Sequence, residues 1–256
     1  MPFIPARSLV TGASSGIGAA FARALAARGS DLVLVARRQD RLRTLAEELR
    51  ARNGIRVEVV PADLSRPGIG AELRALTGPV DLLVNSAGFA THGPLTESDD
   101  ARMEREIDVD VRALVSMTRA YLPDQIAARH GGIVNVASTA GFQPVPGMAV
   151  YGAAKAFVRS FTEAVWHEAR PNGVKVLSLS PGSTRTEFFE IVGTESAAVG
   201  RFQSADTVVN IALRALDARR TPPGVVCGAG NALTATMTRF LPRRLLLDLS
   251  ARMVRT

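Results

Sequence analysis

Short apolar runs alternate along the chain with longer segments of helical periodicity. The apolar runs lie at residues 8–10, 31–36, 57–60, 81–85, 133–137, 174–179 and 225–227. Between them, apolar residues recur at a spacing of three and four over 17–28, 37–52, 65–76, 98–129, 151–170 and 205–218. Strands that are apolar on both faces are typical of a parallel sheet. The strict alternation therefore predicts an α/β fold with a doubly wound parallel sheet of about seven strands, flanked by helices.

The pattern changes near residue 231. We predict a single domain over 1–230, followed by a basic amphipathic helical tail over 231–256. In the tail an apolar residue recurs at every fourth position: Leu233, Met237, Leu241, Leu245, Leu249 and Met253. Pro242 suits the first turn of a helix. Such a tail can dock on its own domain, cover a second subunit or lie on an anionic membrane, and we favour docking.

Composition narrows the class of protein. The 256 residues are 46% hydrophobic and 21% charged, which is typical of a globular chain. The single cysteine, Cys227, excludes a disulfide framework and a cysteine-rich metal site, and no metal is predicted. The N-terminus lacks a secretory pattern, and no apolar run is long enough to span a bilayer. We expect a cytoplasmic protein, with peripheral membrane contact through 233–256 as the alternative.

The net charge of +7 raises the question of an anionic partner. All but two of the 31 basic residues are arginines, and five of them lie in the tail with a single aspartate. Aromatic residues make up only 5% of the chain, so base-stacking surfaces are not indicated. We therefore expect no nucleic-acid partner.

A glycine-rich turn, T-G-A-S-S-G-I-G, follows the first predicted strand and opens the first helix. Glycines allow the backbone to approach a pyrophosphate closely, and the helix N-terminus offers free N–H groups to that anion. This context favours a Rossmann-type dinucleotide site over a turn without a ligand. The candidate cofactor residues in the turn are Gly12, Ser14, Ser15, Gly16, Ile17 and Gly18. The spacing T-G-x-x-x-G-x-G resembles that of the short-chain dehydrogenase/reductase family.

The end of the second strand bears on the choice of cofactor. A carboxylate here would hold the ribose hydroxyls of NAD, but the sequence has Arg37 and Arg38 and no acid. Guanidinium groups bind a 2′-phosphate through charge-assisted hydrogen bonds. We predict NADP(H), with Arg37 as the main contact and Arg38 as a second. The alternative is that both arginines only begin a solvated helix.

Three later strand ends also resemble motifs of the family. The resemblance implies cofactor contacts from Asp63 and Leu64, from Asn85, Ala87 and Gly88, and from Pro181, Gly182, Thr184 and Thr186. Ser86 stands where the family has a second asparagine. We expect Asn85 to bond neighbouring backbone and so to brace the edge of the sheet.

Tyr151 and Lys155 are four residues apart in a predicted helix, which places them on one face. A nearby ammonium stabilises a phenolate and lowers the pKa of the phenol, which favours proton transfer near neutral pH. With Ser138 after the fifth strand, the pair resembles the family's Ser-Tyr-Lys set. The resemblance implies that Tyr151 is the acid/base, that Ser138 polarises the substrate oxygen and that Lys155 binds the nicotinamide ribose.

Asp110 departs from the family pattern, which has an asparagine at this position. An aspartate can still accept a hydrogen bond from water or from Lys155. Its negative charge would, however, weaken the effect of Lys155 on Tyr151. We therefore include Asp110 among the candidate catalytic residues and expect a shifted pH profile or a slow enzyme.

Together these features predict an NADP(H)-dependent oxidoreductase that interconverts a carbonyl and an alcohol on a hydrophobic small-molecule substrate. The alternative is a non-catalytic or slow nucleotide-sensing protein of the same fold. The family is usually dimeric or tetrameric, so we expect a homodimer or homotetramer. Walls of the substrate pocket are expected from Phe89, Thr91, His92, Thr139, Phe142, Pro144, Val145 and the segment 187–202.

Overall fold

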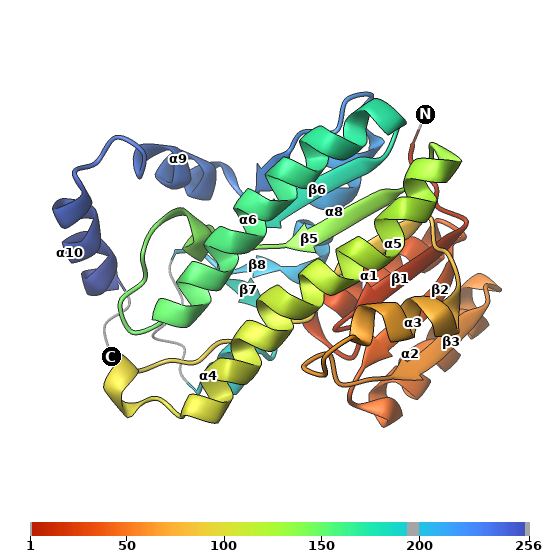
Figure 1. The fold of residues 1–256 in the computed structure, drawn as a ribbon, viewed down its shortest axis with the longest axis horizontal. Helices are drawn as coiled ribbons and strands as arrows, with labels where there is room; N and C mark the ends of the chain where they lie inside the picture. The colour runs from red at the N-terminus through yellow and green to blue at the C-terminus, as the bar shows by residue number, and fades with distance from the viewer. Residues whose placement is uncertain (1, 194–199, 254–256) are drawn as a thin grey trace.

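Seven parallel strands form one sheet at the centre of the molecule, seen in a computed structural model that describes residues 2–193 and 200–253 (Figure 1). The strand order is β3-β2-β1-β4-β5-β6-β9, so the order reverses between β1 and β4. The seven strands are β1 (Arg7–Thr11), β2 (Asp31–Ala36), β3 (Val57–Pro61), β4 (Leu82–Asn85), β5 (Gly132–Val136), β6 (Lys175–Ser180) and β9 (Gly224–Val226). Two shorter strands, β7 (Thr184–Arg185) and β8 (Gln203–Ser204), form a separate pair. The predicted doubly wound parallel sheet is confirmed.

Helices cover both faces of the sheet. The α-helices are α1 (Gly16–Ala27), α2 (Gln39–Asn53), α3 (Ile69–Thr77), α4 (Asp100–Ile107), α5 (Leu114–Ala128), α6 (Ala149–Ala169), α7 (Phe188–Val192), α8 (Ala205–Asp217), α9 (Ala229–Met237) and α10 (Arg243–Met253). Successive strand residues point to opposite faces. In β1, Val10 belongs to the core cluster that also contains side chains of α1, α2 and α8, whereas its neighbour Leu9 belongs to the cluster with side chains of α3, α5 and α6. Burial on both faces therefore explains the uninterrupted apolar runs.

The helix predicted over 98–129 is not regular. It consists of α4, a π-helical segment over Asp108–Ala113 and α5, in direct succession. A π-helical turn inserts an extra residue and occurs often at functional sites. The helix predicted over 65–76 begins only at Ile69, because Gly68 adopts a left-handed conformation with φ of 75°.

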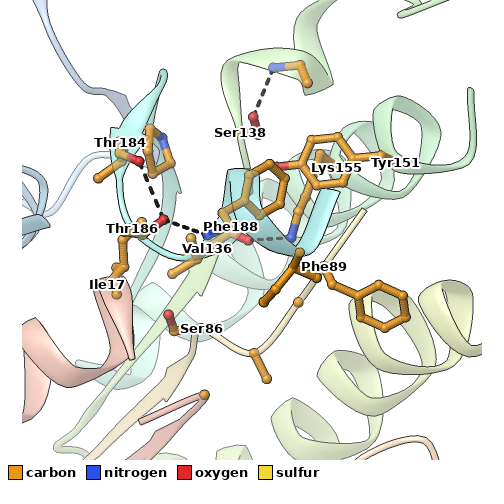
Figure 2. Close-up of a pocket in the computed structure, with 18 of the residues that line it drawn as sticks. Ile17, Ser86, Phe89, Val136, Ser138, Tyr151, Lys155, Thr184, Thr186 and Phe188 are labelled. Atoms are coloured by element: carbon orange, nitrogen blue, oxygen red, sulfur yellow. Dashed lines mark hydrogen bonds between the residues drawn. The ribbon is translucent and has the colours of Figure 1, made fainter. Parts of the chain in front are cut away.

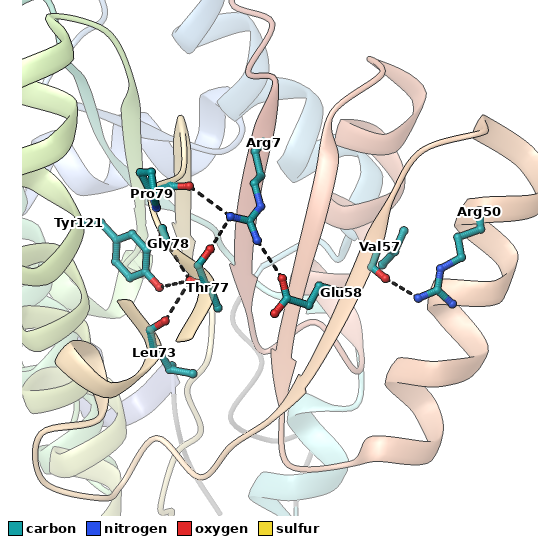
Figure 3. Close-up of polar contacts among 9 residues, drawn as sticks. All are labelled: Arg7, Arg50, Val57, Glu58, Leu73, Thr77, Gly78, Pro79 and Tyr121. Atoms are coloured by element: carbon teal, nitrogen blue, oxygen red, sulfur yellow. Dashed lines mark hydrogen bonds and ion pairs between the residues drawn. The ribbon is translucent and has the colours of Figure 1, made fainter. Parts of the chain in front are cut away.

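Polar contacts tie the strands together at the edge where they begin (Figure 3). The Arg7 guanidinium donates to the carbonyl oxygen of Thr77, and its Nη2 forms an ion pair of 2.8 Å with Glu58. The Thr77 hydroxyl in turn shares a hydrogen bond of 2.8 Å with the buried phenol of Tyr121. This network links β1, β3, α3 and α5 at the edge opposite the carboxyl ends of the strands.

The tail forms α9 and α10, which extend away from the sheet in Figure 1. Leu246 is buried, and the Ser250 hydroxyl donates to the carbonyl oxygen of Pro144 at 2.7 Å, so α10 contacts the rest of the chain. The tail arginines at 239, 243, 244 and 252 are exposed, while Arg255 lies outside the described residues. None of the described helices is long and apolar enough to cross a membrane.

The contact between α3 and α5 yields a stability prediction. A Cβ atom built on Gly70 would lie 2.5 Å from the backbone of Ser116. We expect Gly70→Ala to lower the free energy of unfolding by about 1–3 kcal/mol, because two packed helices must separate. Urea denaturation followed by circular dichroism measures the change.

Gly230 in α9 provides the matched control, because nothing lies within 4 Å of its built Cβ. Gly230→Ala should be neutral or stabilising by up to about 1 kcal/mol, as expected for alanine in a helix. Equal effects of the two substitutions would contradict the close packing of α3 on α5.

Candidate active site

One cavity of about 650 Å³ lies at the carboxyl ends of the strands, where the strand order reverses. Nearly all the predicted site residues line it. They are Gly12, Ser14, Ser15, Gly16, Ile17, Gly18, Arg37, Arg38, Asp63, Leu64, Ala87, Gly88, Ser138, Tyr151, Lys155, Pro181, Gly182, Thr184 and Thr186. Two predicted residues do not line it: Asn85 and Asp110 are buried behind the wall. The fold thus gathers residues that are far apart in the sequence.

The glycine turn is shaped by close backbone packing. Gly12 has φ of 67°, and a Cβ on it would lie 2.9 Å from the Cα of Ala87. A Cβ on Gly18 would lie 2.3 Å from the carbonyl oxygen of Gly12. Ser15, the N-cap of α1, makes no side-chain capping bond, so it does not compete for the amides of the first turn. This surface fits a pyrophosphate, which the amides and the helix dipole would hold.

The two arginines after β2 have different environments. Arg37 is exposed at the rim of the cavity. Arg38 donates from Nη2 to the Ser15 hydroxyl at 2.8 Å, and its Nη1 forms an ion pair of 2.8 Å with Glu187. Glu187 also pairs with Arg41. Arg38 therefore braces the glycine turn, and the Arg37 guanidinium remains available to an anion.

Asp63, which lies after β3, and Asn85, the last residue of β4, play different structural roles. Asp63 accepts from the backbone N–H of Ser65 at 3.0 Å, and this bond holds the pKa of its carboxyl below the ordinary value. Asn85 donates from Nδ2 to the Oδ1 of Asn135 at 2.9 Å and to the hydroxyl of Thr118 at 3.3 Å. The expectation that Asn85 bonds neighbouring backbone is thus wrong: its partners are side chains buried between β4, β5 and α5.

The loop after β6 closes the cavity on the side of α7. The Thr184 hydroxyl donates to the carbonyl oxygen of Gly182 at 2.9 Å. The Thr186 hydroxyl accepts from the backbone N–H of Phe188 at 3.2 Å and donates to the carbonyl oxygen of Thr184 (Figure 2). A Cβ on Gly182 would collide with the side-chain amide of Asn231, so this loop is packed against the start of α9.

Ser138, Tyr151 and Lys155 are brought together by β5 and α6, as Figure 2 shows. Ser138 caps the turn after β5 by accepting from the backbone N–H of Ala140 at 3.1 Å. Tyr151 and Lys155 lie one turn apart in α6, and the Lys155 Nζ is 5.5 Å from the centre of the Tyr151 ring. The Nζ also donates to the carbonyl oxygen of Val136 at 3.2 Å. A phenol, a hydroxyl and an ammonium can therefore act on one substrate oxygen and its surroundings.

Lys155 is paired with Asp110. Its Nζ lies 2.8 Å from the Asp110 Oδ2, and the Asp110 side chain has no exposed surface. The other carboxyl oxygen accepts from the backbone N–H of Phe89 at 3.1 Å. Burial lowers the pKa of Lys155, but the charges of Asp110 and Tyr151 outweigh it and raise that pKa above its ordinary value.

The pKa of Tyr151 differs from the expectation. Burial raises it, while the charge of Lys155 and a hydrogen bond with Ser138 lower it. The charges of Asp110 and Glu106 raise it further, and the net pKa lies above that of a free phenol. The predicted lowering by the ammonium is present, but burial and two acids exceed it.

Glu106 is a site residue that sequence reasoning missed. Its side chain is fully buried, and its Oε2 accepts from the backbone N–H of Thr91 at 2.7 Å. Burial, together with the charge of Asp110, raises the pKa of Glu106 to about 7. The only signal in the sequence is its spacing of four residues from Asp110, which places two acids on one side of a helix.

Apolar side chains and the tail form the substrate side of the cavity. Of the expected wall residues, Phe89, Thr139 and Val145 line it, together with 187–189, Ile191 and Gly200 of the segment 187–202. Thr91, His92, Phe142 and Pro144 do not, and residues 194–199 lie outside the described residues. The tail adds wall residues that were not expected: Asn231, Thr234, Ala235 and Ser250. Among the described residues, no group of three or more histidine, cysteine or acidic side chains could hold a metal.

Comparison with known proteins agrees with this geometry. The family model for short chain dehydrogenases matches residues 7–196. A sulfoacetaldehyde reductase 2 from Chromohalobacter salexigens is 41% identical over 186 residues, which span 70% of this chain and 73% of that protein. A short-chain dehydrogenase from Sphingobium yanoikuyae, solved in complex with NADPH, is 36% identical with a TM-score of 0.81, covering 91% of this chain and 94% of that one. A bulky-bulky ketone specific alcohol dehydrogenase from Comamonas testosteroni is 29% identical with a TM-score of 0.78, covering 94% and 92%.

The chain therefore belongs to the short chain dehydrogenase family. It is an oxidoreductase of that type, with a nucleotide-binding Rossmann-like fold, and the family uses NAD(P) with small-molecule substrates.

The buried carboxyl of Glu106 yields a prediction about stability and pH. Its folded pKa, about 7, lies above the ordinary value of 4.5, so the folded state binds the proton more tightly than the unfolded state does. Stability conferred by the protonated carboxyl is fully present below pH 4.5 and is lost as the pH rises through 7. Glu106→Gln keeps the shape without the charge. Relative to this variant, the wild type should lose roughly 3 kcal/mol of unfolding free energy across that range.

Urea denaturation of both proteins at a series of pH values measures this difference. Glu104→Gln, which changes an exposed acid of the same helix, is the control and should track the wild type. A constant difference between wild type and Glu106→Gln at all pH values would show that Glu106 titrates normally.

Proposed function

We propose that the protein is an NADP(H)-dependent oxidoreductase that interconverts a carbonyl and an alcohol on a hydrophobic substrate. The observation that carries the proposal is the position of Ser138, Tyr151 and Lys155 in the same cavity as the glycine turn. Candidate proton-transfer groups and a surface that fits a dinucleotide thus share one cavity. The 36% identical relative solved with NADPH supports the choice of cofactor.

The residues have distinct roles in this reaction. The dinucleotide, when bound, supplies or accepts a hydride. Tyr151 donates the proton to the substrate oxygen in reduction and accepts it in oxidation, and Ser138 orients that oxygen by hydrogen bonding. Lys155, held by Asp110 and Val136, binds the ribose and stabilises the phenolate form of Tyr151. Because these donors are fixed by β5 and α6, little reorganisation is needed during proton transfer.

The preference for NADP(H) rests on Arg37 and Arg38. Arg37 lies exposed at the cavity rim and can form charge-assisted bonds to a 2′-phosphate. Arg38, already bonded to Ser14 and Ser15 and paired with Glu187, holds the turn in place. No carboxylate lies directly after β2, where one would repel the phosphate.

The cavity walls favour a substrate with an apolar body. Phe89, Val145, Met148, Phe188 and Ile191 line the same cavity as Tyr151. Burial of such a body contributes roughly 25 cal/mol per Å² of apolar surface. The resemblance to an enzyme for bulky ketones is consistent with this size and polarity.

Tyr151→Phe tests the proposed reaction. The variant should lose at least a thousandfold in NADPH-dependent reduction of a panel of aldehydes, ketones and 3-oxoacyl thioesters, because no other phenol lines the cavity. NADPH binding, measured by fluorescence, should change little.

Tyr121→Phe removes the only other phenol of the chain and is the control, since Tyr121 is buried between α5 and α3. It should retain activity. Normal turnover by Tyr151→Phe would exclude the mechanism.

Arg37→Ala tests the choice of cofactor. Loss of a guanidinium bond to phosphate should weaken NADPH binding about 10- to 100-fold, while NADH binding stays within about twofold. Calorimetric titration with both dinucleotides measures this. Arg43→Ala, an exposed arginine of α2 that does not line the cavity, should bind both as the wild type does. A wild-type preference for NADH would overturn the assignment.

A further inference from the structure

Two buried carboxylates, rather than one, lie behind the candidate catalytic lysine. Glu106 in α4 and Asp110 in the π-helical segment are four residues apart, and both side chains are fully buried. Asp110 pairs directly with Lys155 at 2.8 Å. Glu106 lies close enough to this pair that the charges of Asp110 and Lys155 both act on its carboxyl. The mechanism proposed above uses neither acid as a donor or acceptor for the substrate.

The surroundings of Glu106 contain few compensating charges. The loop over 86–94 contributes the Thr91 amide, which bonds Oε2, and His92 is the titratable residue of that loop. The other oxygen, Oε1, has no hydrogen-bond partner within the described part of the chain. From α6, the titratable neighbours that act on Glu106 or are acted on by it are Lys155 and Tyr151. The positive charge of Lys155 thus has to compensate two carboxyl groups and a phenol.

This arrangement changes what Lys155 can do for Tyr151. An ammonium stabilises a phenolate through its positive charge. Here that charge is already neutralised by Asp110, which is four residues from a second acid. A phenolate on Tyr151 would add a further negative charge beside the buried groups Lys155, Asp110 and Glu106, where electrostatic interactions are strong.

We propose that Glu106 and Asp110 are positioning residues that hold Tyr151 in its protonated form and thereby adapt the enzyme to carbonyl reduction. This inference rests on the proposed function. In reduction the substrate carbon receives the hydride supplied by the dinucleotide, the O–H bond of Tyr151 breaks, and its proton passes to the substrate oxygen. The phenolate then regains a proton from solvent.

Oxidation needs the opposite starting state. The substrate O–H bond breaks, its proton passes to a Tyr151 phenolate, and the hydride leaves to the oxidised dinucleotide. When the site disfavours the phenolate, only a small fraction of the enzyme molecules can start alcohol oxidation near neutral pH. The equilibrium constant of the reaction is unchanged. The pH above which oxidation is fast, and the pH up to which reduction stays fast, are both higher than they would be without the two acids.

The chain allows a direct spectroscopic test, because it contains only two tyrosines. In a Tyr121→Phe background, the ultraviolet absorbance of tyrosinate reports Tyr151 alone, and no cofactor or substrate is needed. We expect Asp110→Asn to lower the Tyr151 pKa by about one unit or more, and Glu106→Gln to lower it by a smaller amount. Glu104→Gln, the exposed acid of α4, should leave it unchanged.

The kinetic test compares the two directions in the same variants. For Asp110→Asn, the pH at which alcohol oxidation with NADP⁺ reaches half its maximum should fall with the Tyr151 pKa, which raises the oxidation rate near neutral pH about tenfold. The alkaline limb of carbonyl reduction should move to lower pH by the same interval. If the two acids had a merely structural role, the substitutions would lower the rates of oxidation and reduction in parallel and would not move the limbs of the two pH profiles.

The outcomes separate this inference from the proposed function. Active enzyme with unmoved tyrosinate titration and unmoved pH limbs in both variants would overturn the inference alone. If the wild type is inactive on the whole carbonyl panel, the proposed function is overturned. The inferred preference for reduction is then overturned with it, even if the tyrosinate titration moves in the variants. If Glu106→Gln fails to fold by circular dichroism, Asp110→Asn decides the question by itself.

Discussion

A lysine ammonium removed from water is the constraint around which the candidate active site is built. Burying a charge without a partner is costly, and Lys155 is only 5% exposed. Asp110 and the carbonyl oxygen of Val136 satisfy it, so α6, β5 and the π-helical segment are fixed relative to one another. The same carboxylate leaves no room at Gly88, where a Cβ would lie 2.9 Å from Oδ1. The position of the Lys155 ammonium, the course of the loop at Gly88 and the need for glycine there therefore all depend on the Asp110 carboxylate.

The pairing that stabilises Lys155 also limits it. A charge neutralised within the protein has less effect on a neighbouring phenol than a free charge, and the second acid, Glu106, reduces it further. Fold and chemistry therefore make competing demands on one side chain. The short chain dehydrogenase fold supplies the arrangement of strands, whereas the local charges decide which protonation states are accessible at the substrate oxygen.

The sheet and most of the lining of the cavity could be predicted from the sequence, because both depend on local rules. Buried parallel strands are apolar runs in the sequence, and the turn after β1 needs a glycine at positions 12 and 18. The burial of Glu106 could not be predicted, because its spacing of four residues from Asp110 is a weak signal and Glu104, two residues earlier in the same helix, is exposed. The difference in burial between these two glutamates arises only when α4 packs on α6. The partners of Asn85 are likewise set by tertiary packing and not by the residues next to it.

Two parts of the cavity differ in how they are attached to the fold. The glycine turn after β1, Arg37 after β2 and Ser138 after β5 follow strands that pair with a neighbour on each side. The walls formed by α9 and α10 follow β9, which is an edge strand, and contact the rest through few bonds such as that from Ser250 to Pro144. Exchange of this terminal segment would therefore disturb little of the sheet. Substrate range could diversify through the last helices while the proposed hydride-transfer centre stays intact, which makes the segment a natural target for engineering.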